Sequence, residues 1–347
     1  MIPAAPSEAD SGRYIVMGDK RDGYDTFDAI IAQINALDPI FVIDNGDLVF
    51  SGKPNQYRLF DQSAANISAT LCLTLGNHDI RQNGRSLYTK LYGPAYYSFD
   101  FGDNHFVFLD SSPGWTQKQA ISDEQYAWLE RDLQKAQGKN IYVVTHIPPT
   151  DPRAGVTPNE LPAYMDQLKN DQGAIENLLD RYEANENIDH GFQDRQEAAR
   201  FENLMTEYHV NTVYLSHIHS YFDFTKNNVR YIISGGAGAE LLTENSYYHF
   251  LIAKLGDPTI TIVELPSPAN TLVARYSATA ALFAKAMYRE NRMAATFFLI
   301  GVGLFVLLLL TLIVLRLRRS KLWILVRDTG KSAGKRFKEL YPKKKRG

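Results

Sequence analysis

The feature that most limits how this chain can fold is an uncharged segment of 22 residues, 294–315, made almost entirely of apolar side chains. A helix needs about 20 apolar residues to cross a bilayer, whereas the core helices of globular domains are usually shorter and keep a polar face. Because this segment has no charged face, it predicts a single membrane-spanning helix rather than a helix buried in a protein core. A globular domain must then lie in the residues that precede it.

The charge of the chain changes sign across this segment. Residues 316–347 hold 13 Lys and Arg and 2 acidic residues, a net +11, which leaves 24 basic and 37 acidic residues, a net −13, for residues 1–315. Basic flanks remain on the cytoplasmic side of a span and attract anionic lipid. The pattern predicts a basic cytoplasmic tail at 316–347 and an extracytoplasmic domain. An acidic domain also argues against nucleic acid as a partner.

The first residues of the chain conflict with this topology. Residues 1–12 contain no apolar stretch of the kind that a signal peptide requires. Either this segment is a leader or truncated start that lacks the natural N-terminus, or the span inserts late and the domain stays cytoplasmic. We prefer the first alternative.

Residues 13–265 are patterned as one α/β domain. Short β-rich runs, such as 14–17 and 40–43, alternate with amphipathic segments, such as 24–36 and 123–137. The last strands follow one another without helices between them, so part of the sheet structure should be antiparallel.

Two further segments and one cysteine complete the organisation. The polar, acidic segment 150–193, with a predicted helix at 172–182, is either a surface insertion or a cap over a nearby site. Residues 266–293 indicate a linker and an Ala-rich stalk helix, which we expect at 278–293. Cys72 is the single cysteine, which excludes a disulfide within the chain.

Several predicted strands end in side chains that can ligate a metal. These strand ends carry Asp19, Asp47, Asn77-His78-Asp79, His146 and the pair His217 and His219. Any one of them alone would indicate an ordinary turn or capping residue. Together they follow five apolar runs, at the sheet edge where α/β proteins bind ligands. Carboxylate, amide oxygen and imidazole suit hard and borderline divalent metals.

In these motifs the chain resembles the calcineurin-like metallophosphoesterase superfamily. The matching motifs are GD-L-V at residues 46–49, GNHD at residues 76–79, the strand-end His146 and the H-x-H of His217 and His219, in family order after Asp19. The resemblance implies a four-layer α/β/β/α sandwich that holds two divalent metal ions. It implies that Asp47 bridges the ions, Asp19 and His219 complete the first site, Asn77, His146 and His217 complete the second, and His78 faces the leaving group, with Asp79 orienting it.

The first motif departs from the family pattern. The family usually has Asp-x-His, whereas this chain has Asp19-Lys20-Arg21, and a guanidinium cannot ligate a cation. Purple acid phosphatases also lack this His, but they use a Tyr in the second motif, where this chain has Phe50. Two interpretations of Arg21 stay open. It is a solvated loop residue, or it is a substrate-binding clamp whose planar fork of donors holds phosphate.

The function that the resemblance implies is metal-dependent hydrolysis of a phosphomonoester or phosphodiester at a membrane. A water activated between two ions attacks phosphorus in line, and His78 protonates the leaving oxygen. The ligands suit Mn, Fe, Zn or Co, and the substrate is a phosphorylated small molecule or a lipid headgroup. The alternative is a degenerate relative that binds or scaffolds without turnover. We interpret four histidines outside the motifs as structural: His105, His190, His209 and His249.

Overall fold

The computed structural model describes residues 12–112, 118–154, 189–241 and 246–319. The chain divides into two compact units, residues 1–290 and 291–347. Residues 1–11, most of the insertion at 150–193 with its predicted helix at 172–182, and the tail beyond residue 319 lie outside the described residues.

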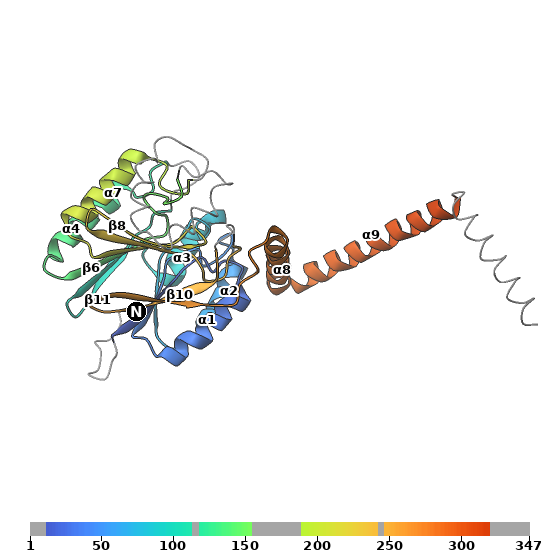
Figure 1. Cartoon of the computed structure of the whole chain (residues 1–347), viewed down its shortest axis with the longest axis horizontal. Coiled ribbons are helices and arrows are strands. Elements are labelled where there is room, and N and C mark those ends of the chain that lie inside the picture. The colour runs from blue at the N-terminus through green and yellow to red at the C-terminus, as the bar shows by residue number, and fades with distance from the viewer. Residues whose placement is uncertain (1–11, 113–117, 155–188, 242–245, 320–347) are drawn as a thin grey trace, which may run out of the picture. The chain divides into compact units, whose positions relative to one another are not determined.

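Five strands form the first sheet, in the order β11-β10-β1-β2-β3 (Figure 1). Its parallel strands are β1 (Arg13–Met17), β2 (Phe41–Asp44) and β3 (Thr70–Leu73). β10 (His249–Lys254) and β11 (Asp257–Glu264) form a hairpin, and β10 pairs antiparallel with β1. The hairpin accounts for the antiparallel strands that we expected late in the domain.

Six strands form the second sheet, in the order β4-β5-β6-β7-β9-β8. They are β4 (Tyr97–Phe101), β5 (Asn104–Phe108), β6 (Asn140–Val144), β7 (Thr212–Leu215), β8 (Tyr221–Lys226) and β9 (Val229–Ser234). β5, β6, β7 and β9 run parallel, and β4 and β8 pair antiparallel at the two edges. The loops that follow the parallel strands therefore begin at the carboxyl edge of each sheet.

Aromatic side chains fill the space between the two sheets. In β1, Tyr14 and Val16 belong to this inner core, whereas Ile15 and Met17 belong to the outer core beneath the helices. The ring of Tyr14 lies 5.5 Å from that of Phe106 in the opposite sheet. Because successive side chains of a strand point to opposite faces, a strand covered on both sides must be apolar throughout.

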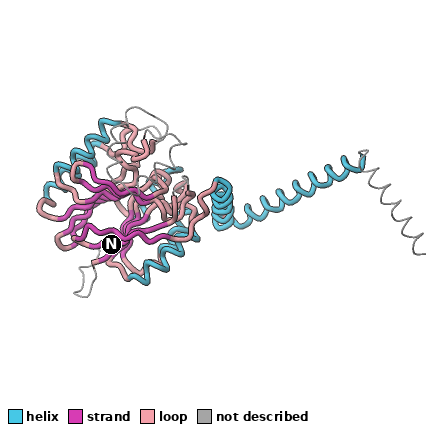
Figure 2. The backbone as a smooth tube through the Cα atoms, viewed as in Figure 1, coloured by secondary structure: helices cyan, strands magenta, loops and turns pink. Residues whose placement is uncertain are grey.

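Helices cover the outer face of each sheet and complete a four-layer α/β/β/α arrangement (Figures 1 and 2). They are α1 (Tyr24–Leu37) and α2 (Pro54–Ala64) on the first sheet, and α4 (Asp123–Lys135) and α7 (Arg195–Glu207) on the second. Ser122 and Asp194 cap α4 and α7 by accepting backbone N–H bonds of the first turn. The predicted fold class is confirmed.

The remaining helices differ more from the sequence-based expectations. A 3₁₀ turn, η1 (Arg81–Asn83), and helix α3 (Gly84–Tyr92) follow the GNHD motif, where we predicted no helix. Helix α8 (Leu272–Glu290) begins before the stalk that we expected at 278–293, and it packs against the domain instead of standing clear of it. The boundaries of a separate stalk stay a prediction.

The second unit contains helix α9 (Arg292–Arg319). Its residues 292–316 form a stretch of 25 residues that contains an 18-residue window with a mean hydropathy of 3.1, and no residue of that window is buried. By length and composition this helix can cross a membrane.

Candidate metal centre

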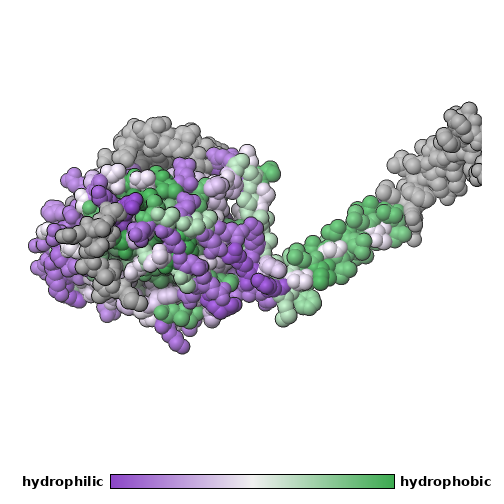
Figure 3. All heavy atoms as spheres, turned by 90° about the horizontal axis from the view of Figure 1, so that it is seen from below, coloured by the Kyte–Doolittle hydropathy of each residue, from purple (hydrophilic) through white to green (hydrophobic). Residues whose placement is uncertain are grey.

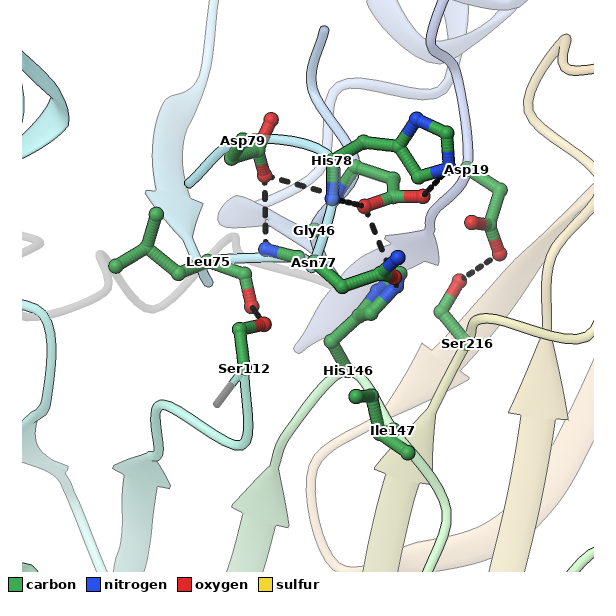
Figure 4. A network of polar contacts seen from close by, with 12 residues as sticks. Asp19, Gly46, Leu75, Asn77, His78, Asp79, Ser112, His146, Ile147 and Ser216 are labelled. Carbon is green, nitrogen blue, oxygen red and sulfur yellow. Dashed lines mark hydrogen bonds and ion pairs between the residues drawn. The ribbon is translucent and has the colours of Figure 1, made fainter. Parts of the chain in front are cut away.

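Loops from both sheets bring the predicted ligands together at one edge of the sandwich. Asp19 follows β1, Asp47 follows β2 and His146 follows β6. Their ligand atoms all lie within 4.8 Å of one another, and all three residues are buried. Asn77 follows β3, and Figure 4 shows Asp19, Asn77 and His146 converging from different loops. This group can hold a metal ion.

The backbone turns sharply to aim these side chains. Asp19, Asp47 and His217 have positive φ angles of 59°, 58° and 69°, a conformation that L-residues adopt rarely and that clusters at functional sites. The Asp19 N–H donates to the carbonyl of Gly46, at 3.0 Å, which ties the first loop to the second. A Cβ on Gly76 would come within 2.2 Å of Asp47 Oδ1, so only glycine fits there.

The polar atoms that face His146 Nε2 have no hydrogen between them with which to form hydrogen bonds. His146 Nδ1 donates to the carbonyl of Asn45 at 2.9 Å, so in the neutral ring Nε2 carries a lone pair. That Nε2 faces Asn77 Oδ1 at 3.1 Å and Asp47 Oδ1 at 3.3 Å, which are also electron-pair donors. A divalent cation between these atoms would relieve their repulsion, so the residues fit a metal.

The first-site residues show the same pattern. His219 Nδ1 donates to the carbonyl of Glu240 at 2.6 Å, and Nε2 lies 3.5 Å from Asp19 Oδ1. Asp19 Oδ2 accepts the Ser216 hydroxyl at 2.6 Å, whereas Oδ1 is buried and has no hydrogen-bond partner among the described residues. This orphaned oxygen fits a bound cation.

His217 completes the group of imidazoles. Its ring lies edge-on to that of His146, with centroids 5.2 Å apart. Burial and the neighbouring His146 lower the pKa of His217 well below its ordinary value, so the ring is neutral and can ligate a metal.

Asp79 holds the two central loops together. Its Oδ2 accepts the backbone N–H groups of Asp47 and Gly76, at 3.0 and 2.8 Å, and its Oδ1 accepts that of Val49 at 3.0 Å. These bonds fix the position of Asp47. We expected Asp79 to orient His78; the bonds that its carboxylate makes go to the backbone instead.

His78 is held in a neutral form at the rim. Its Nδ1 donates to the carbonyl of Phe50 at 2.7 Å, and its Nε2 accepts from the Arg81 guanidinium at 2.8 Å. Burial lowers the pKa of His78 to about 4, and the charges of Arg21 and Arg81 add to the effect although Asp47 opposes it. Donation of a proton from Nε2 would require the ring to exchange its bond with Arg81.

Arg21 is buried against the first-site residues, so it is not a solvated loop residue. Its Nη2 lies 3.0 Å from Glu240 Oε1, and its Nη1 donates to His219 Nε2 at 3.3 Å. The guanidinium also lies over the ring of Phe50, 4.9 Å from its centroid. Neighbouring Lys20 points the other way, with Nζ 3.9 Å from the Tyr24 ring centroid, and burial lowers its pKa to about 7.

Comparison with known proteins agrees with this geometry. Residues 12–221 match the calcineurin-like phosphoesterase family. The chain belongs to this family. Within it, the glycerophosphodiester phosphodiesterase GpdQ of Enterobacter lignolyticus (strain SCF1) is 31% identical over 129 residues, which are 35% of this chain and 46% of that protein. The match thus spans about half the length of this curated relative.

Solved structures show the same calcineurin-like phosphoesterase fold. A purple acid phosphatase from yellow lupin (Lupinus luteus) has a TM-score of 0.52 and 16% identity, with 75% of this chain and 53% of that chain covered. A dimetal phosphatase from Danio rerio has a TM-score of 0.53 and 12% identity, with 74% and 96% covered. At these identities the likeness concerns the fold.

Several residues that the sequence analysis did not assign to the site lie beside it in this phosphoesterase. Glu240 belongs to no motif, and only folding pairs it with Arg21. Arg81 lies three residues after His78, a spacing that could have indicated contact in a turn. His190, interpreted as structural, has its ring centroid 5.7 Å from that of His217.

Proposed function

We propose that this calcineurin-like phosphoesterase hydrolyses phosphate esters in a metal-dependent reaction, at a membrane to which residues 292–316 anchor it. The observation that carries the proposal is the buried group of Asp19, Asp47 and His146, whose ligand atoms lie within 4.8 Å of one another. The relative named as a glycerophosphodiester phosphodiesterase supports a phosphodiester as the substrate, with a phosphomonoester as the alternative.

Two divalent ions account for the whole donor set. Asp19, Asp47 and His219 would hold the first ion, and Asp47, Asn77, His146 and His217 the second. When bound, such ions polarise phosphoryl oxygens and lower the pKa of water between them. Nitrogen and oxygen donors without thiolate suit Mn, Fe, Zn or Co.

Arg21 supplies a fixed positive charge beside these ions. Its Nε is buried and has no hydrogen-bond partner among the described residues, so the guanidinium keeps an N–H for a ligand. Its pairing with Glu240 and its stacking on Phe50 preorganise the fork. In the proposal Arg21 binds a non-bridging phosphoryl oxygen.

His78 and Arg81 serve the leaving-group side in the proposal. Because His78 Nε2 accepts from Arg81, the pair presents a guanidinium rather than an imidazolium. Arg81 would stabilise the negative charge that develops on the departing oxygen, and His78 would hold Arg81 in place.

The test combines metal content with hydrolysis. Asp47→Asn should lower the bound metal per chain and remove nearly all hydrolysis of bis(4-nitrophenyl) phosphate and 4-nitrophenyl phosphate. Asp103→Asn, an exposed aspartate in the turn between β4 and β5, is the matched control and should behave as wild type. Wild-type hydrolysis by Asp47→Asn, or full activity after exhaustive chelation, would refute metal-dependent hydrolysis.

Arg21→Ala tests the phosphate clamp. A lost charge-assisted hydrogen bond costs about 1.5–3 kcal/mol, or roughly ten- to a hundred-fold in binding. The KM of the dianionic monoester should rise by this factor, and that of the monoanionic diester should rise less. Unchanged KM values for both substrates would remove Arg21 from substrate binding.

A second function, binding without turnover, is favoured by one observation. Arg21 Nη1 lies 3.3 Å from His219 Nε2, the atom that the first ion needs. If the guanidinium keeps that position when metal is added, the chain would hold one ion and serve as a binding or scaffold protein. Titration to a single ion per chain with no hydrolysis of either ester would support this alternative.

The orientation of the domain is part of the proposal. The +11 charge of residues 316–347 supports a cytoplasmic tail, at an anionic lipid surface, and an extracytoplasmic catalytic domain. In sealed vesicles of known orientation, protease on the extracytoplasmic side should cleave the domain and spare the tail. Cleavage of the tail alone would place the domain in the cytoplasm.

A further inference from the structure

Helix α8 is fixed to the domain by charged and apolar contacts. Its charged residues are Arg275, Lys285, Arg289 and Glu290. Lys285 and Arg289 bind Asp25 of α1, at 2.7 and 2.6 Å. Glu290 accepts from Gln56 of α2 at 2.6 Å, and Arg275 is buried. The side of α8 that faces the domain also contains apolar residues, since Ala286 is buried and Phe283 packs on Phe50.

The opposite side of α8 is exposed and carries no charge. It consists of Val273, Tyr276, Ser277, Ala280, Ala284, Met287 and Tyr288, which recur at helical spacing. Val273 is 81% exposed and Tyr276 is 73% exposed. These residues are called the outer face. The side of a surface helix that faces water usually carries charged residues, and the outer face carries none. In Figure 3 α8 forms a pale band at the edge of a domain that is largely purple.

The chain itself indicates what covers the outer face. A single residue, Asn291, separates the end of α8 from the start of the stretch 292–316 that can cross a membrane. Covalent continuity therefore keeps the C-terminal end of α8 within a few ångströms of the bilayer surface when that stretch is inserted. Tyrosines with small and apolar neighbours are typical of the membrane–water interface.

We propose that α8 is an interfacial helix whose outer face lies in the headgroup region of the same bilayer that 292–316 crosses. This inference rests on the membrane anchoring in the proposed function and extends that anchoring. In addition to the span, the domain contacts the membrane through the outer face of α8. The bonds of Lys285, Arg289 and Glu290 then fix the orientation of the domain on the lipid.

The docking surface also adjoins the metal centre. Phe283 of α8 packs on Phe50, with ring centroids 5.5 Å apart. Phe50 in turn contacts the ring of His78 at 5.3 Å and the guanidinium of Arg21. Docking through α8 therefore holds this wall of the centre near the headgroups, where phosphoesters of the membrane surface can reach it.

The experiment places a fluorophore on single cysteines of the full chain in vesicles. The background is Cys72→Ala, because the native cysteine is buried. Labels at Val273→Cys, Ala280→Cys and Ala284→Cys probe the outer face. Gln134→Cys, an exposed position on helix α4, is the matched control, and Leu304→Cys in α9 reports insertion of the span.

Lipids brominated in the acyl chains should quench the outer-face labels and the Leu304 label but not the Gln134 label. Aqueous iodide should quench the Gln134 label alone. Iodide quenching of the outer-face labels equal to that of Gln134, with Leu304 quenched by lipid, would overturn the docking. Protection from both quenchers would also overturn it, since a protein would then cover α8. Lack of lipid quenching at Leu304 would refute the anchoring itself. Hydrolysis of bis(4-nitrophenyl) phosphate by the same sample tests the proposed hydrolytic activity separately.

Discussion

The pairing of Arg21 with Glu240 gives the sharpest prediction about how this site is built. Both side chains are nearly buried, at 7% and 11% exposure, and their charged atoms lie 3.0 Å apart. Glu240 Oε2 is buried without a hydrogen-bond partner among the described residues. Arg21→Ala therefore leaves a carboxylate that has lost its counter-charge and cannot reach water. With metal removed, no cation replaces the guanidinium.

The size of the destabilisation by Arg21→Ala follows from the burial of the ion pair. Removing one partner of a buried ion pair costs about 3–5 kcal/mol, because the remaining charge is uncompensated. For a domain of this size about 1 kcal/mol shifts the midpoint of thermal unfolding by about 2–4 °C, so Arg21→Ala should lower Tm by about 6–20 °C. Glu240→Ala leaves the guanidinium its contacts with His219 and Phe50, and it should cost less. The double variant should be less destabilised than the sum of the two single variants.

The assay is a double-mutant cycle by denaturant unfolding in the presence of chelator. The coupling energy between Arg21 and Glu240 should be about 0.5–3 kcal/mol, the range for residues in one charged network. Asp103→Asn again serves as the control for a lost surface charge. Additive effects of Arg21→Ala and Glu240→Ala would refute the buried pair and, with it, the preorganised phosphate fork.

Three further predictions concern other residues. Asp79→Asn replaces one of the two acceptor oxygens of the carboxylate with an amide donor. The free energy of unfolding should fall by about 1–3 kcal/mol for each backbone N–H that loses its acceptor. The bound metal per chain should also fall, because Asp47 is displaced. Burial opposes protonation of His105, but its bonds to Asp132 and Asp100 raise its pKa above the ordinary value. Protonated His105 should therefore stabilise the fold fully below pH about 6.5, and this stability should be lost as pH rises through the raised pKa. In unfolding measurements His105→Asn should remove this dependence of stability on pH. His78→Ala should slow esters with poor leaving groups more than esters with good ones, because Arg81 loses the contact that holds it beside the departing oxygen. Because both side chains act through Arg81, adding Arg81→Ala should cause little further loss; a double variant whose loss is the full product of the two single losses would contradict this.

The sequence by itself was sufficient for the family and for the fold class. Each motif is a short local pattern, an apolar run followed by Asp, Asn or His, and a strand whose faces are both covered is apolar in every position, as in β1. The order of these motifs from Asp19 to His219 therefore indicated the architecture before any contact was known. The apolar stretch near the C-terminus was equally plain, because the length of a span depends on composition alone.

The tertiary structure determined which residues far apart in the sequence come into contact. Glu240 lies 219 residues from Arg21 in the sequence, so no local pattern could pair them. The resemblance implied that Asp79 orients His78, but its carboxylate accepts backbone N–H groups of Asp47 and Val49 in a different loop. Packing after folding, and not sequence proximity, determines which donors a buried carboxylate meets.

Helix α8 shows the same division most clearly. Its sequence reveals that one side of the helix carries no charge, and the usual rule would place charged residues on the side that faces water. The bonds of α8 to Asp25 and Gln56 and the packing of Phe283 on Phe50 fix the helix on the domain and leave its uncharged side exposed. A helical pattern determines that two faces exist, but only the partners brought by the fold determine which face is covered.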